Sequence, residues 1–90
     1  MEKHVYCIAV FSDARRAIAA QEALVRAGIQ VAVMPTPREL TAHCGLSLRF
    51  APPLLPQVRQ VLADREKGLA EGSFYRLEYD DRQRSVMPVR

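Results

Sequence analysis

The sequence predicts an α+β domain of the ferredoxin-like βαββαβ class, a four-stranded antiparallel sheet with two helices on one face. Three observations support this class. The chain has 90 residues, which suits a single domain with little room for a deep enclosed site. Four short segments are rich in β-forming residues, and two amphipathic segments separate them in the order that the class requires. We expect the domain to span residues 1–80 and residues 81–90 to form a loose tail.

The first half of the chain is expected to form a strand, a helix and a second strand. Residues 4–11 (HVYCIAVF) are mostly apolar and rich in β-forming residues, which predicts a strand with both faces partly covered. Ser12 is a suitable N-cap for a helix over residues 14–27. Gly28 is placed to end that helix, and residues 29–34 (IQVAVM) predict the second strand.

The second half repeats the pattern after an irregular stretch. Residues 36–45 (TPRELTAHCG) have no strand or helix period, apart from one possible helical turn after Thr36. Residues 46–50 alternate apolar and polar, which indicates a third strand. Residues 54–67 predict the second helix, and residues 74–79 (FYRLEY) predict the fourth strand.

The first strand has apolar side chains on both faces. Val5, Cys7, Ala9 and Phe11 alternate with Tyr6, Ile8 and Val10. Because the helices cover only one face, the other needs cover from the 36–45 loop, the tail or a second subunit. We therefore expect a homo-oligomer.

Composition and charge limit the class of partner. The chain is 49% hydrophobic and carries a net charge of +3, but its arginines are scattered among acids rather than gathered in a stripe. Nucleic acid is therefore not the expected partner. The weakest hypothesis is nucleic-acid binding through arginines near the C-terminal end: Arg65, Arg76, Arg82, Arg84 and Arg90. No apolar run reaches the ~20 residues of a membrane helix. The two cysteines are too few for a disulfide framework and no signal peptide is visible, so we expect a cytoplasmic protein with reduced thiols.

The 36–45 loop contains most of the chemically reactive residue types that lie outside the expected core. Cys44 on an irregular segment is more accessible than a strand cysteine. Arg38 and a protonated His43 would favour its thiolate, which is the nucleophilic form. Gly45 would permit a tight turn, and its N–H would help to form an anion-binding nest.

Each of these residues also has a plainer interpretation. Cys44 could be a small apolar residue under the loop, and Arg38 an ordinary surface charge paired with its neighbour Glu39. Arg49 is expected on the face without helices, where it would bind an anion or a partner's carboxylate, or remain solvated. Cys7, mid-strand among apolar neighbours, is expected to be an inert core residue.

Metal and cofactor signatures are absent from the sequence. A zinc site needs three or four converging ligands. His43 and Cys44 are adjacent, and His4 and Cys7 fall on opposite faces of a strand. No glycine-rich phosphate loop and no Gly-x-Ser-x-Gly elbow occurs. We expect no metal and no cofactor.

Residues 35–50 (PTPRELTAHCGLSLRF), together with Phe11 and residues 27–29, resemble a small bacterial family described as selenium/sulfur carrier protein-like. The resemblance covers roughly residues 4–79. It implies that Cys44 carries sulfur or selenium. His43 departs from the small polar residue that the family commonly has before the cysteine, and the tail is an addition to the pattern.

Two functions follow as expectations. In the first, the protein accepts sulfur or selenium on Cys44 as a persulfide or selenide. Its partner is then a cysteine desulfurase or an acceptor protein. In the second, it is a non-catalytic regulatory module that binds a small ligand or protein and dimerises through its sheet. In both it is a carrier or binding protein rather than a true enzyme.

Overall fold

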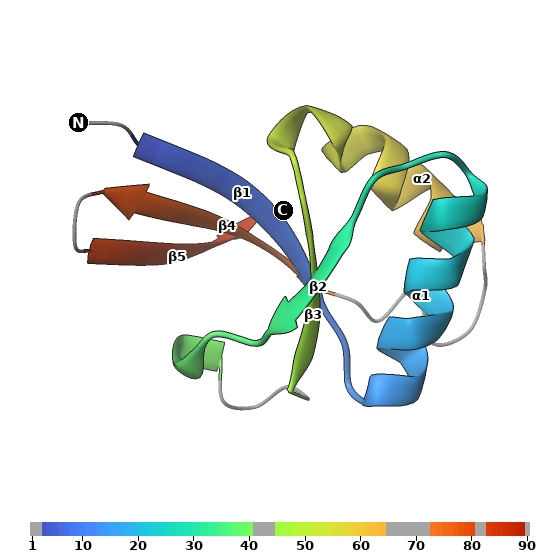
Figure 1. Ribbon diagram of the computed structural model, residues 1–90, viewed down its shortest axis with the longest axis horizontal. Helices are drawn as coiled ribbons and strands as arrows, with labels where there is room; N and C mark the ends of the chain where they lie inside the picture. Colours follow the sequence, from blue (N-terminus) through green and yellow to red (C-terminus); the bar gives the residue numbers. More distant parts are fainter. Residues whose placement is uncertain (1–2, 41–44, 65–72, 81–82, 90) are drawn as a thin grey trace.

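The computed structural model describes residues 3–40, 45–64, 73–80 and 83–89. It has two layers, an antiparallel sheet and a pair of helices that pack on one of its faces (Figure 1). The elements follow one another as β1 (Lys3–Val10), α1 (Ala14–Arg26), β2 (Ala32–Pro35), the 3-10 turn η1 (Arg38–Leu40), β3 (Leu46–Phe50), the 3-10 turn η2 (Pro52–Leu54), α2 (Leu55–Asp64), β4 (Ser73–Asp80) and β5 (Gln83–Val89).

The sheet has five strands in the order β2-β3-β1-β4-β5, and every neighbouring pair is antiparallel. The predicted α+β class with two helices is therefore confirmed, and the predicted count of four strands is wrong. The additional strand is β5, which lies in the segment expected to be a loose tail. Its residues pair with β4 from Phe74↔Val89 to Asp80↔Gln83. The ferredoxin-like assignment stays a prediction.

The two edge strands both contain a proline. β2 ends at Pro35 and β5 contains Pro88. Proline has no N–H to donate to a ladder, so it is tolerated at an edge far better than in a central strand. The second strand was predicted over residues 29–34, which stops before Pro35. The structure instead includes it, paired with Leu46.

Helix α1 is closed at both ends by its own residues. Asp13, rather than the predicted Ser12, is the N-cap, and its carboxylate accepts a hydrogen bond of 2.8 Å from the Arg16 amide. Ser12 instead accepts one from the Arg16 guanidinium. At the other end Gly28 has φ +82°, the left-handed conformation that glycine adopts at little cost. The amides of Gly28 and Ile29 donate to carbonyls of the last turn, as in a Schellman motif.

The main core lies between the helices and the sheet. Alternation along β1 turns Cys7 and Ala9 toward the helices, and Leu48 and Phe50 of β3 join them. The rest of this core comes from the two helices and from the residues on either side of α1: Ala17, Ala20, Leu24, Val58, Leu62, Phe11 and Ile29. Ala27 was predicted to be the last residue of the first helix, but the helix ends at Arg26 and Ala27 is exposed.

A second, smaller core lies on the face without helices. Ile8, Val10 and Leu77 are fully buried there. Leu40 of η1 and Val86 of β5 pack against them. The loop and the tail of the same chain therefore cover the centre of this face, two of the three kinds of cover that the sequence allowed. The expected homo-oligomer stays a prediction.

Neither helix within the described ranges combines the length and the apolar character that crossing a membrane requires.

Candidate functional site

Three of the five predicted site residues lie in the described part of the chain: Arg38, Gly45 and Arg49. His43 and Cys44 lie outside the described residues. The structure therefore places the two ends of the loop that carries Cys44, and the site is built from those ends.

The two ends of the loop are bonded to each other. The Thr36 amide donates a hydrogen bond of 3.0 Å to the Gly45 carbonyl. The hydroxyls of Thr36 and Ser47 lie 2.7 Å apart and share a second bond. Ser47 is fully buried although it is polar, so the bond satisfies a group that would be costly to leave unpaired. The chain thus leaves β2 and re-enters β3 through one fixed junction.

The turn η1, just after this junction, is fastened to the helix-free face. The Leu40 amide donates to the Pro37 carbonyl at 2.9 Å, which forms the single helical turn expected after Thr36. The Leu40 side chain packs against the second core, and the Arg84 guanidinium donates to the Glu39 carboxylate at 2.8 Å. A strand near the C-terminal end therefore holds the segment that precedes Cys44.

Electrostatics at η1 follow from these contacts. The pKa of Glu39 is lowered, first by a hydrogen bond from its own backbone amide and then by Arg84, with a smaller contribution from Arg38. The pKa of Arg84 is raised by its hydrogen bonds to Glu39 and Tyr79. Glu39 therefore stays ionised and directs its charge to Arg84. The plainer interpretation of Arg38, a surface charge beside Glu39, agrees with its exposed position.

Gly45 does not need to be glycine for its backbone conformation. Among the described glycines only Gly28 has a positive φ. A Cβ added at Gly45 would meet no atom within 4 Å. The tight turn expected at this position involves residues outside the described part of the chain and stays a prediction. Within the described residues, no atom fills the space that a Cβ on Gly45 would take.

Arg49 lies on the face without helices, as the sequence predicted. In the strand register Arg49 lies opposite Ile8 of β1 and Ala32 of β2. Its guanidinium carbon lies 4.6 Å from the centre of the Tyr6 ring. Arg49 is four positions along the chain from Gly45, a distance of roughly 13 Å at the rise of an extended strand. Arg49 therefore belongs to a different region of the sheet from the loop junction.

The second cysteine, Cys7, is part of the main core. Its side chain is 3% exposed, and burial raises the pKa of its thiol; Arg76 and Arg59 oppose that shift without cancelling it. A buried thiol with a raised pKa is a poor nucleophile at neutral pH. The predicted core position of Cys7 is confirmed.

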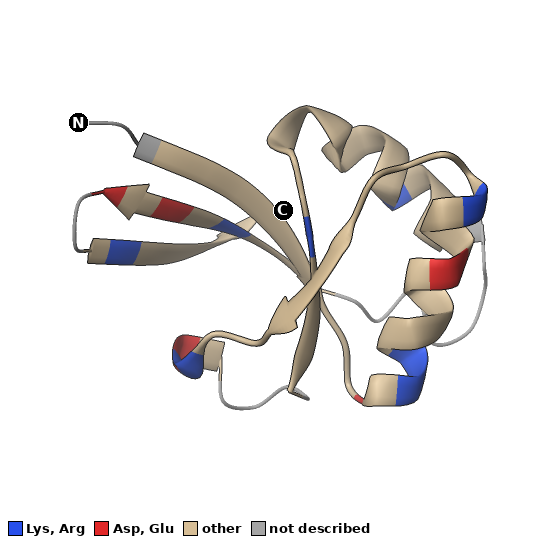
Figure 2. Ribbon diagram, in the orientation of Figure 1, with Lys and Arg blue, Asp and Glu red and all other residues tan. Residues whose placement is uncertain are grey.

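Basic and acidic residues are interspersed along the helices and strands rather than gathered on one of them (Figure 2). Arg76 bonds to Glu78 at 3.0 Å on the helix side of β4, whereas Arg84 bonds to Glu39 on the opposite face. These two members of the C-terminal arginine group therefore do not form one basic stripe. No three His, Cys, Asp or Glu side chains within the described ranges are grouped as metal ligands.

Sequence reasoning missed two participants. Arg84 was placed in a loose tail, and its pairing with Glu39 depends on β5, for which the sequence gives only a weak signal. Tyr6 was assigned to the same face of the first strand as Ile8 and Val10, but nothing in its spacing indicated that Arg49 would stack on its ring.

Comparison with protein families gives a match over most of the chain. The profile of the family described as "Putative Se/S carrier protein-like" matches residues 6–76. The chain belongs to this family. The Se/S carrier protein-like segment includes Cys7, the whole 36–45 loop and both helices, and it ends before β5 begins. No curated protein and no solved structure matches the chain.

Proposed function

We propose that this member of the Se/S carrier protein-like family carries sulfur or selenium on Cys44, as a persulfide or its selenium equivalent. The observation that carries the proposal is the burial of the other cysteine, Cys7. The chain has two cysteines, and Cys7 is buried with a raised pKa. Cys44 is then the thiol available to a carrier.

The anchoring of the loop supports the same role. A carrier cysteine must meet two partners in turn, so the segment that bears it benefits from ends that are held in place. Hydrogen bonds at Thr36, the packing of Leu40 and the Glu39–Arg84 pair hold those ends.

The assigned roles are simple. Cys44 is the nucleophile and carrier. Arg38, which η1 leaves exposed, and His43 favour the thiolate over the thiol, and the Gly45 amide helps to hold the charged sulfur. Arg49, at the far end of β3, is not assigned a role in holding the sulfur of Cys44.

The transfer step is an exchange between sulfur atoms. The Cys44 thiolate attacks the outer sulfur of a cysteine persulfide on the donor protein. A new S–S bond forms on Cys44, the donor's S–S bond breaks, and the donor cysteine leaves as a thiolate. The outer sulfur keeps its proton and no external oxidant is needed.

Mass spectrometry tests the proposal directly. The protein is incubated with a cysteine desulfurase and cysteine, and the intact mass is measured without reductant. We expect an increase of about 32 Da, one sulfur atom, on the peptide that contains Cys44. Cys44→Ser should lose the adduct, and the matched control Cys7→Ala should keep it. An adduct on neither cysteine, or one that persists in Cys44→Ser, contradicts the proposal.

A second candidate is a non-catalytic module that binds a small ligand, and the surface pocket beside Arg49 favours it. The rate of Cys44 alkylation separates the two candidates. A carrier thiol should react with iodoacetamide faster at pH 7 than an unperturbed thiol of pKa ~8.5. A thiol that reacts no faster, in a protein whose Cys44→Ser variant still functions, favours the binding module.

A further inference from the structure

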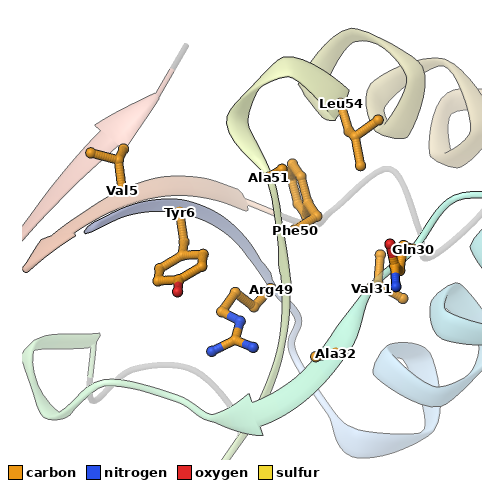
Figure 3. A pocket seen from close by; sticks show the side chains of 9 residues that line it. All are labelled: Val5, Tyr6, Gln30, Val31, Ala32, Arg49, Phe50, Ala51 and Leu54. Carbon is orange, nitrogen blue, oxygen red and sulfur yellow. The ribbon is translucent and has the colours of Figure 1, made fainter. Parts of the chain in front are cut away.

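A pocket of about 320 Å³ opens beyond the end of β3, and side chains from both faces of the sheet line it. Its walls come from β1, β3, η2 and the residues before β2. Figure 3 shows the Tyr6 ring and the Arg49 guanidinium side by side, with Leu54 and Val31 across from Tyr6. This volume is at the lower end of the range typical for small-molecule sites.

The strand register creates this pocket. Pairing between β1 and β3 stops at Cys7↔Phe50, whereas β1 continues to Lys3 with partners in β4 alone. Pairing between β2 and β3 starts at Ala32↔Arg49. β2 and β3 therefore both end near this point while β1 continues, and no strand in the described part of the chain pairs with residues 3–6 of β1 on the side of β3. The hollow follows from the fold itself rather than from a chance arrangement of surface side chains.

Arg49 supplies the positive charge of the pocket. The Tyr6 ring covers one face of its guanidinium at 4.6 Å, which orients the plane of the group and leaves its N–H donors at the rim. Within the described residues, no acidic side chain lies within ion-pair distance of Arg49, whereas Arg76 and Arg84 each have a carboxylate partner. Arg49 therefore presents a guanidinium group of fixed orientation, with N–H donors available to a ligand in the pocket.

The remaining walls are mostly apolar. Val31, Phe50 and Leu54 line the pocket, with the Gln30 side chain as a further polar group. An inorganic anion would pair with the guanidinium but leave the apolar walls exposed to water. A purely apolar molecule would cover the walls but make no ion pair with the guanidinium. We propose that the pocket binds a small organic carboxylate with an apolar body, its carboxylate on Arg49 and its body against Val31 and Leu54. This site is additional to the carrier function and does not depend on it.

The test is a titration of the ¹⁵N-labelled protein with phenylacetate, followed by NMR. We expect saturable shifts of the amides of Tyr6, Val31, Arg49 and Leu54. Two probes act as controls, since phenylacetamide lacks the charge and acetate lacks the apolar body. Each should bind at least about tenfold more weakly, the loss expected when a charge-assisted bond or the buried ring is removed.

Variants separate the pocket from general surface charge. Arg49→Gln should weaken phenylacetate binding about tenfold or more. The matched control Arg15→Gln, an exposed arginine on α1, should bind normally. If Arg49→Gln unfolds, Ala51→Phe tests the pocket instead, since Ala51 is an exposed residue of its wall, and it should block binding.

Three results overturn the proposal: no saturable shift at millimolar phenylacetate, equal affinity for phenylacetamide, or equal weakening by Arg49→Gln and Arg15→Gln. Saturable shifts on the open edge of β1 with a short peptide but not with phenylacetate would assign the hollow to a protein segment and also overturn it. Because Cys44→Ser should bind phenylacetate as the parent protein does, failure here is distinct from failure of the carrier function.

Discussion

The Arg84 guanidinium donates a hydrogen bond of 2.8 Å to the Glu39 carboxylate, although the two residues are 45 positions apart in the sequence. The bond joins β5, which lies beyond the family-matched segment, to the turn that leads into the Cys44 loop. A strand outside the family pattern therefore contributes to the position of the proposed carrier loop.

The titration of Glu39 should report this contact. Its pKa is lowered, so the stability it contributes is present above its ordinary value of 4.5 and is lost as the pH falls through the lowered value. Arg84→Gln should raise the pKa of Glu39 only part of the way back, because the largest cause is the bond from its own backbone amide. Carboxyl NMR titration measures this. A complete return to 4.5 would show that Arg84 alone causes the shift.

The Thr36–Ser47 hydroxyl pair should behave as a unit. Ser47→Ala leaves the partly buried Thr36 hydroxyl without this partner, and Thr36→Val does the same to the buried Ser47. Each should lower the free energy of unfolding by about 1–3 kcal/mol. The double variant should lose less than the sum, because both polar groups are then gone. Urea unfolding measures all four proteins, and strictly additive losses would mean that the bond contributes no coupling.

The buried thiol of Cys7 should make the protein sensitive to alkali. Its folded-state pKa is raised above the ordinary 9.0. The stability it contributes is therefore complete below pH 9.0 and is lost as the pH rises through the raised value. Above that pH the parent protein should lose more free energy of unfolding than Cys7→Ala. Urea unfolding across the alkaline range, with Cys44 kept in both proteins, isolates this difference; parallel profiles would contradict it.

The two described glycines should respond differently to alanine. Neither position has an atom within 4 Å of an added Cβ, but Gly28 alone has a positive φ. Gly28→Ala should cost about 1–2 kcal/mol of stability from its left-handed backbone. Gly45→Ala should change stability by no more than about 0.5 kcal/mol. Thermal or urea unfolding compares them, and an equal loss would mean that Gly45 is also constrained.

Elements with a strong local period were predictable from the sequence. Leu46, Leu48 and Phe50 alternate with polar residues, and β3 has the predicted bounds and faces. The buried stripe of α1 follows in the same way from its helical spacing, with Ala17, Ala20 and Leu24 all in the core. In these segments the apolar residues fall on one face of the element. Their spacing along the chain therefore predicts the element without knowledge of what packs against it.

Elements that depend on distant partners were not predictable. β5 contains a proline and several polar residues, and its strand conformation comes from pairing with β4 rather than from its own composition. The pocket at Arg49 arises because β1 continues past the points where β2 and β3 end, which is a property of three strands together.

The prolines of the outer strands have a consequence for how copies of the protein meet. A free strand edge invites further strands and, in the extreme, fibril growth. Pro35 and Pro88 each remove one amide donor from an otherwise open border, so continuous addition of strands to either border is disfavoured. If the protein associates with itself, contact through a face of the sheet or through the helices is favoured over an extended intermolecular ladder.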